Sequence, residues 1–114
     1  MEDCIFCKIV KKEIGSTIVY EDEEILAFKD IHPVTPIHIL VIPKKHISSA
    51  MEVSKEDQIV IGKMFLVIQK LAKQLGIEEK GFRIINNCGE DGGQEVQHFH
   101  FHLLAGTKLG TKLN

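Results

Sequence analysis

The chain has 114 residues, of which 44% are hydrophobic and 26% charged, a composition typical of one globular domain spanning residues 1–114. Its 14 basic and 16 acidic side chains give a net charge of −2, which offers no overall attraction for nucleic acid or an anionic membrane. No apolar run reaches the roughly 20 residues of a membrane span, and the N-terminus lacks the apolar segment of a signal peptide, so we expect a cytoplasmic protein.

The first half of the chain predicts one short helix and three strands. Residues 4–13 carry apolar side chains at helical spacing, and two strands over 16–24 and 25–30 meet at an acidic hairpin turn. A third strand begins at His38 and stops at Pro43, because proline has no N–H to donate to a neighbouring strand.

The second half predicts a long helix and two more strands. Ser54 is a suitable N-cap, apolar residues recur at helical spacing as far as Leu75, and Gly76 is suited to end the helix in a left-handed conformation. Strands are expected over 82–87 and 96–105. The order of elements predicts an α+β fold with a five-stranded, mainly antiparallel sheet and two helices. The apolar side chains of the long helix are expected in the core or at a subunit interface.

The segment GGQEVQHFHFHLLAG, residues 92–106, places His98, His100 and His102 at alternate positions. In a strand these imidazoles share one face, with the intervening phenylalanines on the other, so we expect a row of histidines on one surface. Two chemistries use such a row: metal coordination, and nucleophilic attack on phosphorus by a neutral imidazole. The Gly-rich loop 86–95 just upstream is suited to bind phosphate through backbone N–H groups, which favours phosphoryl or nucleotidyl transfer. A solvated, functionless row beside a simple turn is the alternative.

Cys4 and Cys7 form a C-x-x-C motif, which in a reducing compartment indicates metal or redox chemistry before a structural disulfide. A redox role of the thioredoxin kind is disfavoured because the motif does not follow a strand of a βαβ unit. A pair of reduced, half-buried cysteines without function is the alternative. We assign no role to Cys88.

These residues resemble the pattern of a known family. HFHFHLL matches the histidine-triad pattern His-φ-His-φ-His-φ-φ, where φ is apolar. The similarity extends from CIFCKI through AFKDIHPVTPIHILVIPKKHI and DGGQEV to HLLAG. The chain resembles the HINT-like branch of the histidine-triad (HIT) nucleotide-binding proteins. That resemblance implies a five-stranded antiparallel sheet with two helices, and a homodimer in which the two sheets run together.

The resemblance also implies an activity: hydrolysis of purine nucleoside 5′-phosphoramidates or related nucleotidyl conjugates to a nucleoside monophosphate, through a nucleotidyl-histidine intermediate. His100 would be the nucleophile, and His98 would orient it chiefly through its backbone carbonyl. His102 would hydrogen-bond the phosphate or bridging atom, and His38 would act as a proton shuttle near the leaving group. The alternatives are a dinucleoside polyphosphate hydrolase that uses the same histidine, and a nucleotide-sensing or interaction protein whose hydrolysis is incidental.

For nucleotide binding, Asp30 matches the family's carboxylate for the ribose hydroxyls. Asn87 and the backbone of Gly93, Gln94 and Glu95 match the phosphate-binding positions. Apolar residues match the base pocket: Ile5, Phe6, Ile9, Phe28, Ile31 and Leu40. Glu95 is a departure, because many relatives carry serine there and a carboxylate repels phosphate. The C-terminal TKLGTKLN also lacks the tryptophan-containing tail of some members.

In zinc-bearing members of the family, a cysteine pair is completed by two histidines at positions matching His46 and His98. The resemblance therefore implies that Cys4 and Cys7 join these histidines around a structural Zn²⁺. Such a closed tetrahedral site would tie the N-terminal helix to the histidine strand, and it leaves no open position for a catalytic water.

Overall fold

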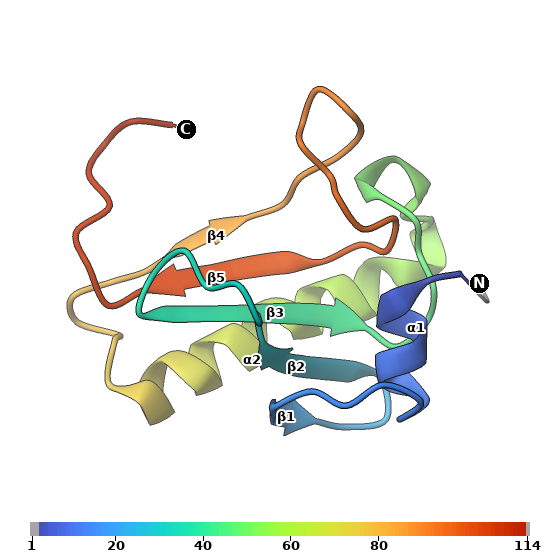
Figure 1. Ribbon diagram of the computed structural model, residues 1–114, viewed down its shortest axis with the longest axis horizontal. Helices are drawn as coiled ribbons and strands as arrows, with labels where there is room; N and C mark the ends of the chain where they lie inside the picture. The colour runs from blue at the N-terminus through green and yellow to red at the C-terminus, as the bar shows by residue number, and fades with distance from the viewer. Residues whose placement is uncertain (1–2, 114) are drawn as a thin grey trace.

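The computed structural model describes residues 3–113, which form a five-stranded antiparallel sheet in the order β1-β2-β3-β5-β4 (Figure 1). The strands are β1 (Ile18–Glu21), β2 (Ile25–Lys29), β3 (Ile37–Pro43), β4 (Arg83–Ile85) and β5 (Phe101–Ala105). The α-helices are α1 (Ile5–Val10) and α2 (Gln58–Leu75), and short 3₁₀ helices cover Ala50–Glu52 and Lys55–Asp57. The α+β fold expected from the sequence is confirmed. The expected single domain 1–114 also includes residues 1, 2 and 114, which lie outside the described residues.

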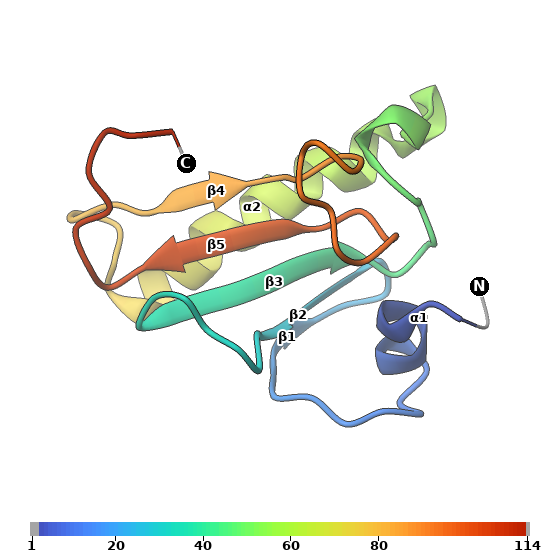
Figure 2. The ribbon, with the colours of Figure 1, turned by 45° about the horizontal axis from the view of Figure 1, so that its top comes forward.

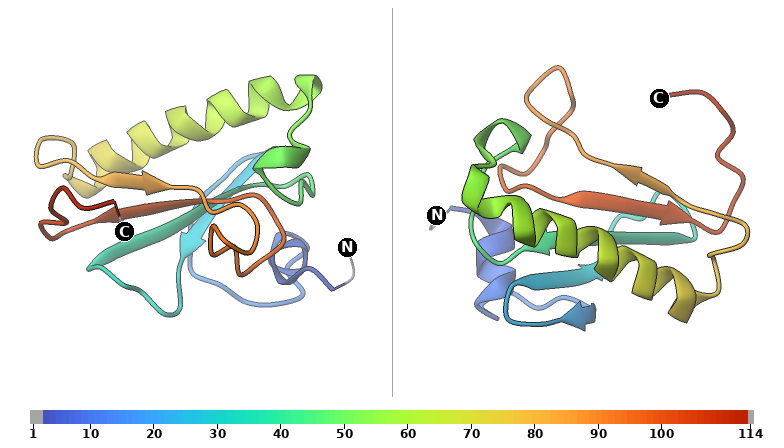
Figure 3. Two further views of the ribbon diagram at one scale, coloured as in Figure 1. Left: turned by 90° about the horizontal axis from the view of Figure 1, so that it is seen from above. Right: turned by 180° about the vertical axis from the view of Figure 1, so that it is seen from behind.

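The two α-helices pack on opposite faces of the sheet (Figure 3). Successive side chains of a strand point to opposite faces, so β3 supplies Val41 to the cluster that contains Met64 of α2. On the other face, Leu40 joins the cluster that contains Phe6 of α1. Because β3 is covered on both sides, it is a continuous apolar run rather than an alternating one. Within residues 3–113, no helix combines the length and apolar character that crossing a bilayer requires.

Local side-chain chemistry sets the turns and the ends of α2. In the β1–β2 hairpin, the Asp22 carboxylate accepts hydrogen bonds from the N–H groups two and three residues later, both at 2.8 Å. Gly76 has a φ of 70° and ends α2 in the left-handed conformation that was predicted. Ser54 does not cap α2 directly. Its N–H and hydroxyl instead donate to the Asp57 carboxylate at 2.9 and 3.0 Å, which starts the 3₁₀ turn that leads into α2.

Several predicted elements are shorter in the structure. The helix expected over 4–13 is reduced to α1, and Lys12 just beyond it has a left-handed φ of 64°. The strands expected over 16–24 and 82–87 are reduced to β1 and β4. After β4, Asn86 directs its side-chain amide to the carbonyl of His100 at 2.9 Å, where the chain leaves the sheet.

The strand expected over 96–105 was also too long, because β5 begins only at Phe101. Its partner β3 ends at Pro43, which has no N–H to extend the ladder. Before β5 the chain turns, and the His98 N–H donates to the carbonyl two residues earlier at 2.9 Å. The loop joining β4 to β5 consequently folds over the end of the sheet where α1 also lies (Figure 2).

Candidate active site and metal cluster

A cavity of about 560 Å³ opens on the α1 face of the sheet. All six apolar residues predicted for a base pocket line it: Ile5, Phe6, Ile9, Phe28, Ile31 and Leu40. So do the polar residues expected around a nucleotide: Asp30, His38, Asn87, Gly93, Glu95, His100 and His102. Sequence reasoning missed other lining residues, including Val34, Ile85 and Leu104, because they come from a loop and two strands that meet only in the fold. The cavity is therefore apolar at one side and carries imidazoles and a Gly-rich loop at the other.

The expectation of a row of surface histidines is wrong in one respect, because His98 and His100 are buried and His102 is half-buried. His98 is 0% and His100 5% exposed, since α1 covers this face of the sheet. The ring of Phe6 lies edge-on to both, with ring centroids 5.9 and 5.1 Å away. His100 and His102 line the cavity, whereas His98 turns toward the cysteines of α1. The triad is thus divided between two sites.

His100 is held by its backbone neighbour. Its Nδ1 lies 2.6 Å from the carbonyl oxygen of His98, and because a carbonyl only accepts, Nδ1 carries the proton. Nε2 is then left with a lone pair. Burial lowers the pKa of His100 below its ordinary value, so the ring is neutral at neutral pH. The Asn86 amide, 2.9 Å from the His100 carbonyl, fixes the backbone here, a contact that sequence reasoning did not find.

His102 lies in a hydrogen-bonded chain that also begins at the backbone. The Val34 N–H donates to His38 Nδ1 at 3.2 Å, so the proton of neutral His38 must reside on Nε2. That Nε2–H donates to His102 Nδ1 at 2.9 Å, which leaves the proton of His102 on its own Nε2. Burial, with His100 and His38 nearby, lowers the pKa of His102 to about 4.

Asp30 joins this chain at its edge, with Oδ2 3.4 Å from His38 Nε2. Together with His102 these side chains bring three possible metal-ligand atoms within 4.8 Å of one another. A metal is a poor fit, because the Val34 N–H forces the proton of His38 onto Nε2, the atom that would coordinate. The group is better explained as a hydrogen-bonded relay.

The Gly-rich loop uses part of its backbone internally. The N–H of Gly93 donates to the Glu90 carbonyl and that of Gln94 to the Gly89 carbonyl, both at 3.0 Å. The sequence had led us to expect that both N–H groups bind phosphate. In this conformation neither is available to do so. Among the described residues, the N–H of Glu95 has no such partner.

Side chains brace the same loop. The buried Gln94 accepts the Gly89 N–H at 3.0 Å and donates to the Ser48 carbonyl at 2.7 Å, so it supports the loop from below and does not line the cavity. Asn87 donates to the Gly92 carbonyl at 2.7 Å. Gly92 must be glycine, because a Cβ there would collide with the backbone carbonyl of Cys88.

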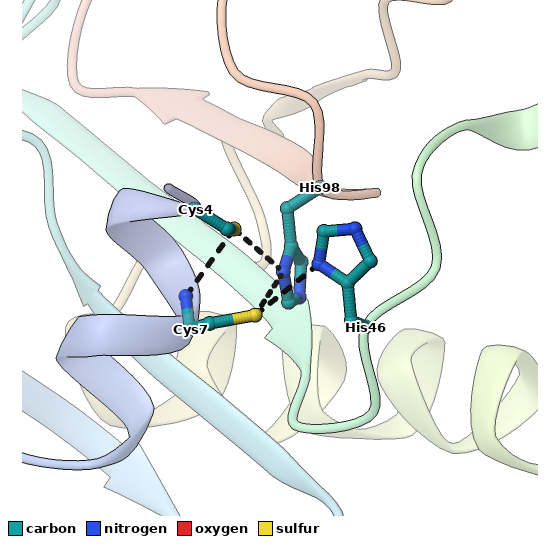
Figure 4. Close-up of side chains that lie close together, drawn as sticks. All are labelled: Cys4, Cys7, His46 and His98. Atoms are coloured by element: carbon teal, nitrogen blue, oxygen red, sulfur yellow. Dashed lines mark hydrogen bonds between the residues drawn. The ribbon is translucent and has the colours of Figure 1, made fainter. Parts of the chain in front are cut away.

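Cys4, Cys7, His46 and His98 converge beside the cavity, with their ligand atoms within 4.8 Å of one another (Figure 4). His98 Nδ1 lies 3.4 Å from Cys4 Sγ and 3.6 Å from Cys7 Sγ. His46 Nδ1 lies 3.2 Å from Cys7 Sγ. The His98 Nε2–H donates to the carbonyl of Pro43 at 2.8 Å, which fixes the tautomer with a lone pair facing the sulfurs.

The protonation of this cluster suits a cation. Burial lowers the pKa of His98 to about 4 and also lowers that of His46, so both imidazoles are neutral and able to coordinate. Burial and the neighbouring Cys4 raise the pKa of Cys7 to about 11, so a thiolate here needs a positive charge beside it. Two thiols and two neutral imidazoles around one point are the donor set of a closed tetrahedral zinc site.

Comparison with known proteins agrees with this geometry. The HIT domain family model matches residues 11–109. The chain is 48% identical over 112 residues to the purine nucleoside phosphoramidase of Escherichia coli, covering 98% of this chain and 94% of that protein. It superposes on a histidine triad protein from Clostridium difficile with a TM-score of 0.95 and 53% identity, over 98% and 97% of the two chains. A HIT family hydrolase from Clostridium thermocellum gives a TM-score of 0.97 at 46% identity, over 100% and 99%. With its three alternate histidines leading into β5 and these relatives along its whole length, the chain belongs to the histidine-triad (HIT) family.

Proposed function

We propose that this protein hydrolyses purine nucleoside 5′-phosphoramidates and related nucleotidyl conjugates to nucleoside monophosphates. The observation that carries the proposal is the 2.6 Å hydrogen bond from His100 Nδ1 to the His98 carbonyl, beside a cavity of nucleotide size. It leaves His100 Nε2 as an uncharged nucleophile held by the backbone, as attack on phosphorus requires. The name of the Escherichia coli relative supports the same substrate class.

In the first step His100 Nε2 forms a bond to the α-phosphorus and the P–N bond breaks. The electron pair of that bond goes to the amine nitrogen, which takes the proton of His102 Nε2 and leaves as a neutral amine. The His38–His102 pair has then lost one proton, and the positive charge of the nucleotidyl-His100 ring offsets it. In the second step water adds to phosphorus, its proton returns to the pair, and the P–His100 bond breaks to release the monophosphate.

The remaining lining residues bind the nucleotide. Asp30 accepts from the ribose hydroxyls, and the apolar wall between α1 and β2 contacts the base. The phosphate is held by Asn87 and by the N–H of Glu95. The internal hydrogen bonds of Gly93 and Gln94 suit them to shaping the loop, with no direct contact to phosphate.

We also propose that the Cys4, Cys7, His46 and His98 cluster binds structural Zn²⁺. Zinc bound there would hold the two thiolates and close a coordination shell that has no position for water. His98 then has two roles, because its ring joins the cluster while its carbonyl fixes the tautomer of His100. The cluster therefore positions the nucleophile and takes no part in the chemical steps.

We further propose that the protein works as a cytoplasmic homodimer in which the two sheets are joined at β4. β4 is an edge strand whose outer N–H and C=O groups are free to pair. On α2, Ile59 and Leu66 are 71% and 61% exposed, and Phe65 packs against Phe101 of β5. An apolar helix face beside an unpaired strand edge is typical of a subunit interface.

The test is steady-state hydrolysis of adenosine 5′-phosphoramidate by the wild type and by His100→Ala. We expect AMP release by the wild type and a loss of about 10³-fold or more in kcat for the variant, because the nucleophile is gone. AMP affinity should change by less than about tenfold, since the ring makes few of the nucleotide contacts. Near-normal turnover by His100→Ala would exclude it as the nucleophile. Tight AMP binding by a wild type that turns over no phosphoramidate would favour the nucleotide-sensing alternative.

A further inference from the structure

Glu95 stands where the cavity meets a second hollow. It lines the large cavity beside Gly93 and Val96, next to the histidines. It also lines the adjoining hollow of about 400 Å³, which adds Asp3 and His46. Its side chain is exposed to solvent. The proposed function places the phosphate at the N–H of Glu95, so a leaving group on that phosphate lies near the Glu95 carboxylate.

No positive side chain offsets that carboxylate among the described lining residues of either hollow. Lys29 is the sole lysine or arginine that lines the cavity in residues 3–113. It follows Ala27 in the alternation of β2, so its side chain leaves the sheet on the α2 face, away from the cavity. Among the described lining residues, Glu95 and Asp3 thus carry negative charge with no lysine or arginine directed toward them.

We propose that Glu95 selects the leaving group, favouring nucleoside phosphoramidates whose amine carries a second, positively charged group. This inference rests on the proposed function and names its substrate class. A cationic substituent gains attraction to the carboxylate, whereas a polyphosphate leaving group brings several negative charges into a region that already holds two acidic side chains. Glu95 is therefore a specificity-determining residue.

The experiment compares three adenosine 5′-phosphoramidates whose N-substituents differ in charge: 2-aminoethyl, propyl and 2-carboxyethyl. The aminoethyl and propyl groups have the same number of heavy atoms, so their ratio of kcat/KM isolates the charge. The wild type is compared with Glu95→Gln and with Glu90→Gln. Glu90 is an exposed residue of the same loop whose side chain does not line either hollow, so the second variant is a matched control.

We expect the wild type to favour aminoethyl over propyl by about tenfold in kcat/KM, and to disfavour carboxyethyl. The preference should fall to nearly one in Glu95→Gln, persist in Glu90→Gln, and shrink at high salt because the carboxylate is exposed. A wild-type ratio near one, or a ratio that Glu95→Gln leaves unchanged, would overturn the inference. If all three compounds and the parent phosphoramidate resist hydrolysis, the proposed function itself is wrong and this inference falls with it.

Discussion

Backbone groups decide the tautomers of three histidines in this site. The Pro43 carbonyl fixes His98, the His98 carbonyl fixes His100, and the Val34 N–H fixes His38. A backbone carbonyl cannot donate and a backbone N–H cannot accept, so each tautomer follows without further assumption. The sequence predicted which residues have these roles, but it did not reveal the partners. Pro43 is 55 residues away from His98, and the Val34 N–H is positioned by an irregular loop.

The buried environment of His100 leads to a prediction for the pH dependence of activity. Burial lowers the pKa of His100 below the ordinary value of 6.5, so the neutral nucleophile persists as the pH falls through 6.5. We expect kcat/KM for adenosine 5′-phosphoramidate to be constant from about pH 8 to 6.5 and to fall only at lower pH. The uncatalysed acid hydrolysis is subtracted at each pH. An acid limb with its midpoint at or above pH 6.5 would show that the ring is not desolvated as described.

At the scale of elements, α1 depends on its contacts. A six-residue helix is far too short to be stable alone in water. Phe6 and Ile9 bury its inner face against β2 and β3, and Cys4 and Cys7 bring it to the metal cluster. Because α1 covers His98 and His100 and lines the cavity, its attachment controls both sites.

Replacing Cys4 and Cys7 together by serine should therefore abolish zinc binding and destabilise the protein. We expect the melting temperature to fall by at least about 5 °C, the shift that ~1 kcal/mol produces in a domain of this size. Zinc is measured by mass spectrometry of the purified protein and unfolding by calorimetry. Cys88→Ser is the control, because Cys88 lies in the Gly-rich loop and outside the cluster, and it should retain zinc. A double variant that still holds one zinc per chain would end the assignment.

The lengths of the elements show what sequence patterns can predict. Periodicity located both helices and the strands with one buried face, because burial of one face imposes it, whereas an apolar run ending at a proline located β3. It misplaced the start of β5, since HFHFHLL alternates without a break while the strand requires a partner that Pro43 cannot provide. Sequence periodicity did not predict the 3₁₀ turn after Ser54 for a similar reason. The contact between Ser54 and the Asp57 side chain determines that turn, and no hydrophobic repeat does.

At the scale of the whole molecule, the fold brings four distant segments around two adjoining sites: α1, the loop before β3, the loop after β3 and the Gly-rich loop. The family pattern predicted nearly all the residues that gather there. It also implied how they divide, with His98 in the metal cluster and the other two triad histidines in the cavity. That division depends on where α1 packs, which no local pattern contains.

The exposed face of α2 carries the last prediction. Leu66 is 61% exposed on a helix beside the unpaired edge of β4, and an interface there would bury it in both copies of a symmetric dimer. A charge introduced at this position would appear twice in the interface without a partner and would cost several kcal/mol. We expect the wild type to sediment with twice the mass of the chain and Leu66→Lys to shift to the single-chain mass at micromolar concentration. Ile18→Lys, in β1 at the opposite edge of the sheet, is the matched control and should leave the dimer intact. If Ile18→Lys alone dissociates the dimer, the two sheets join at β1. A wild type that sediments as a single chain would mean that each copy completes its site alone.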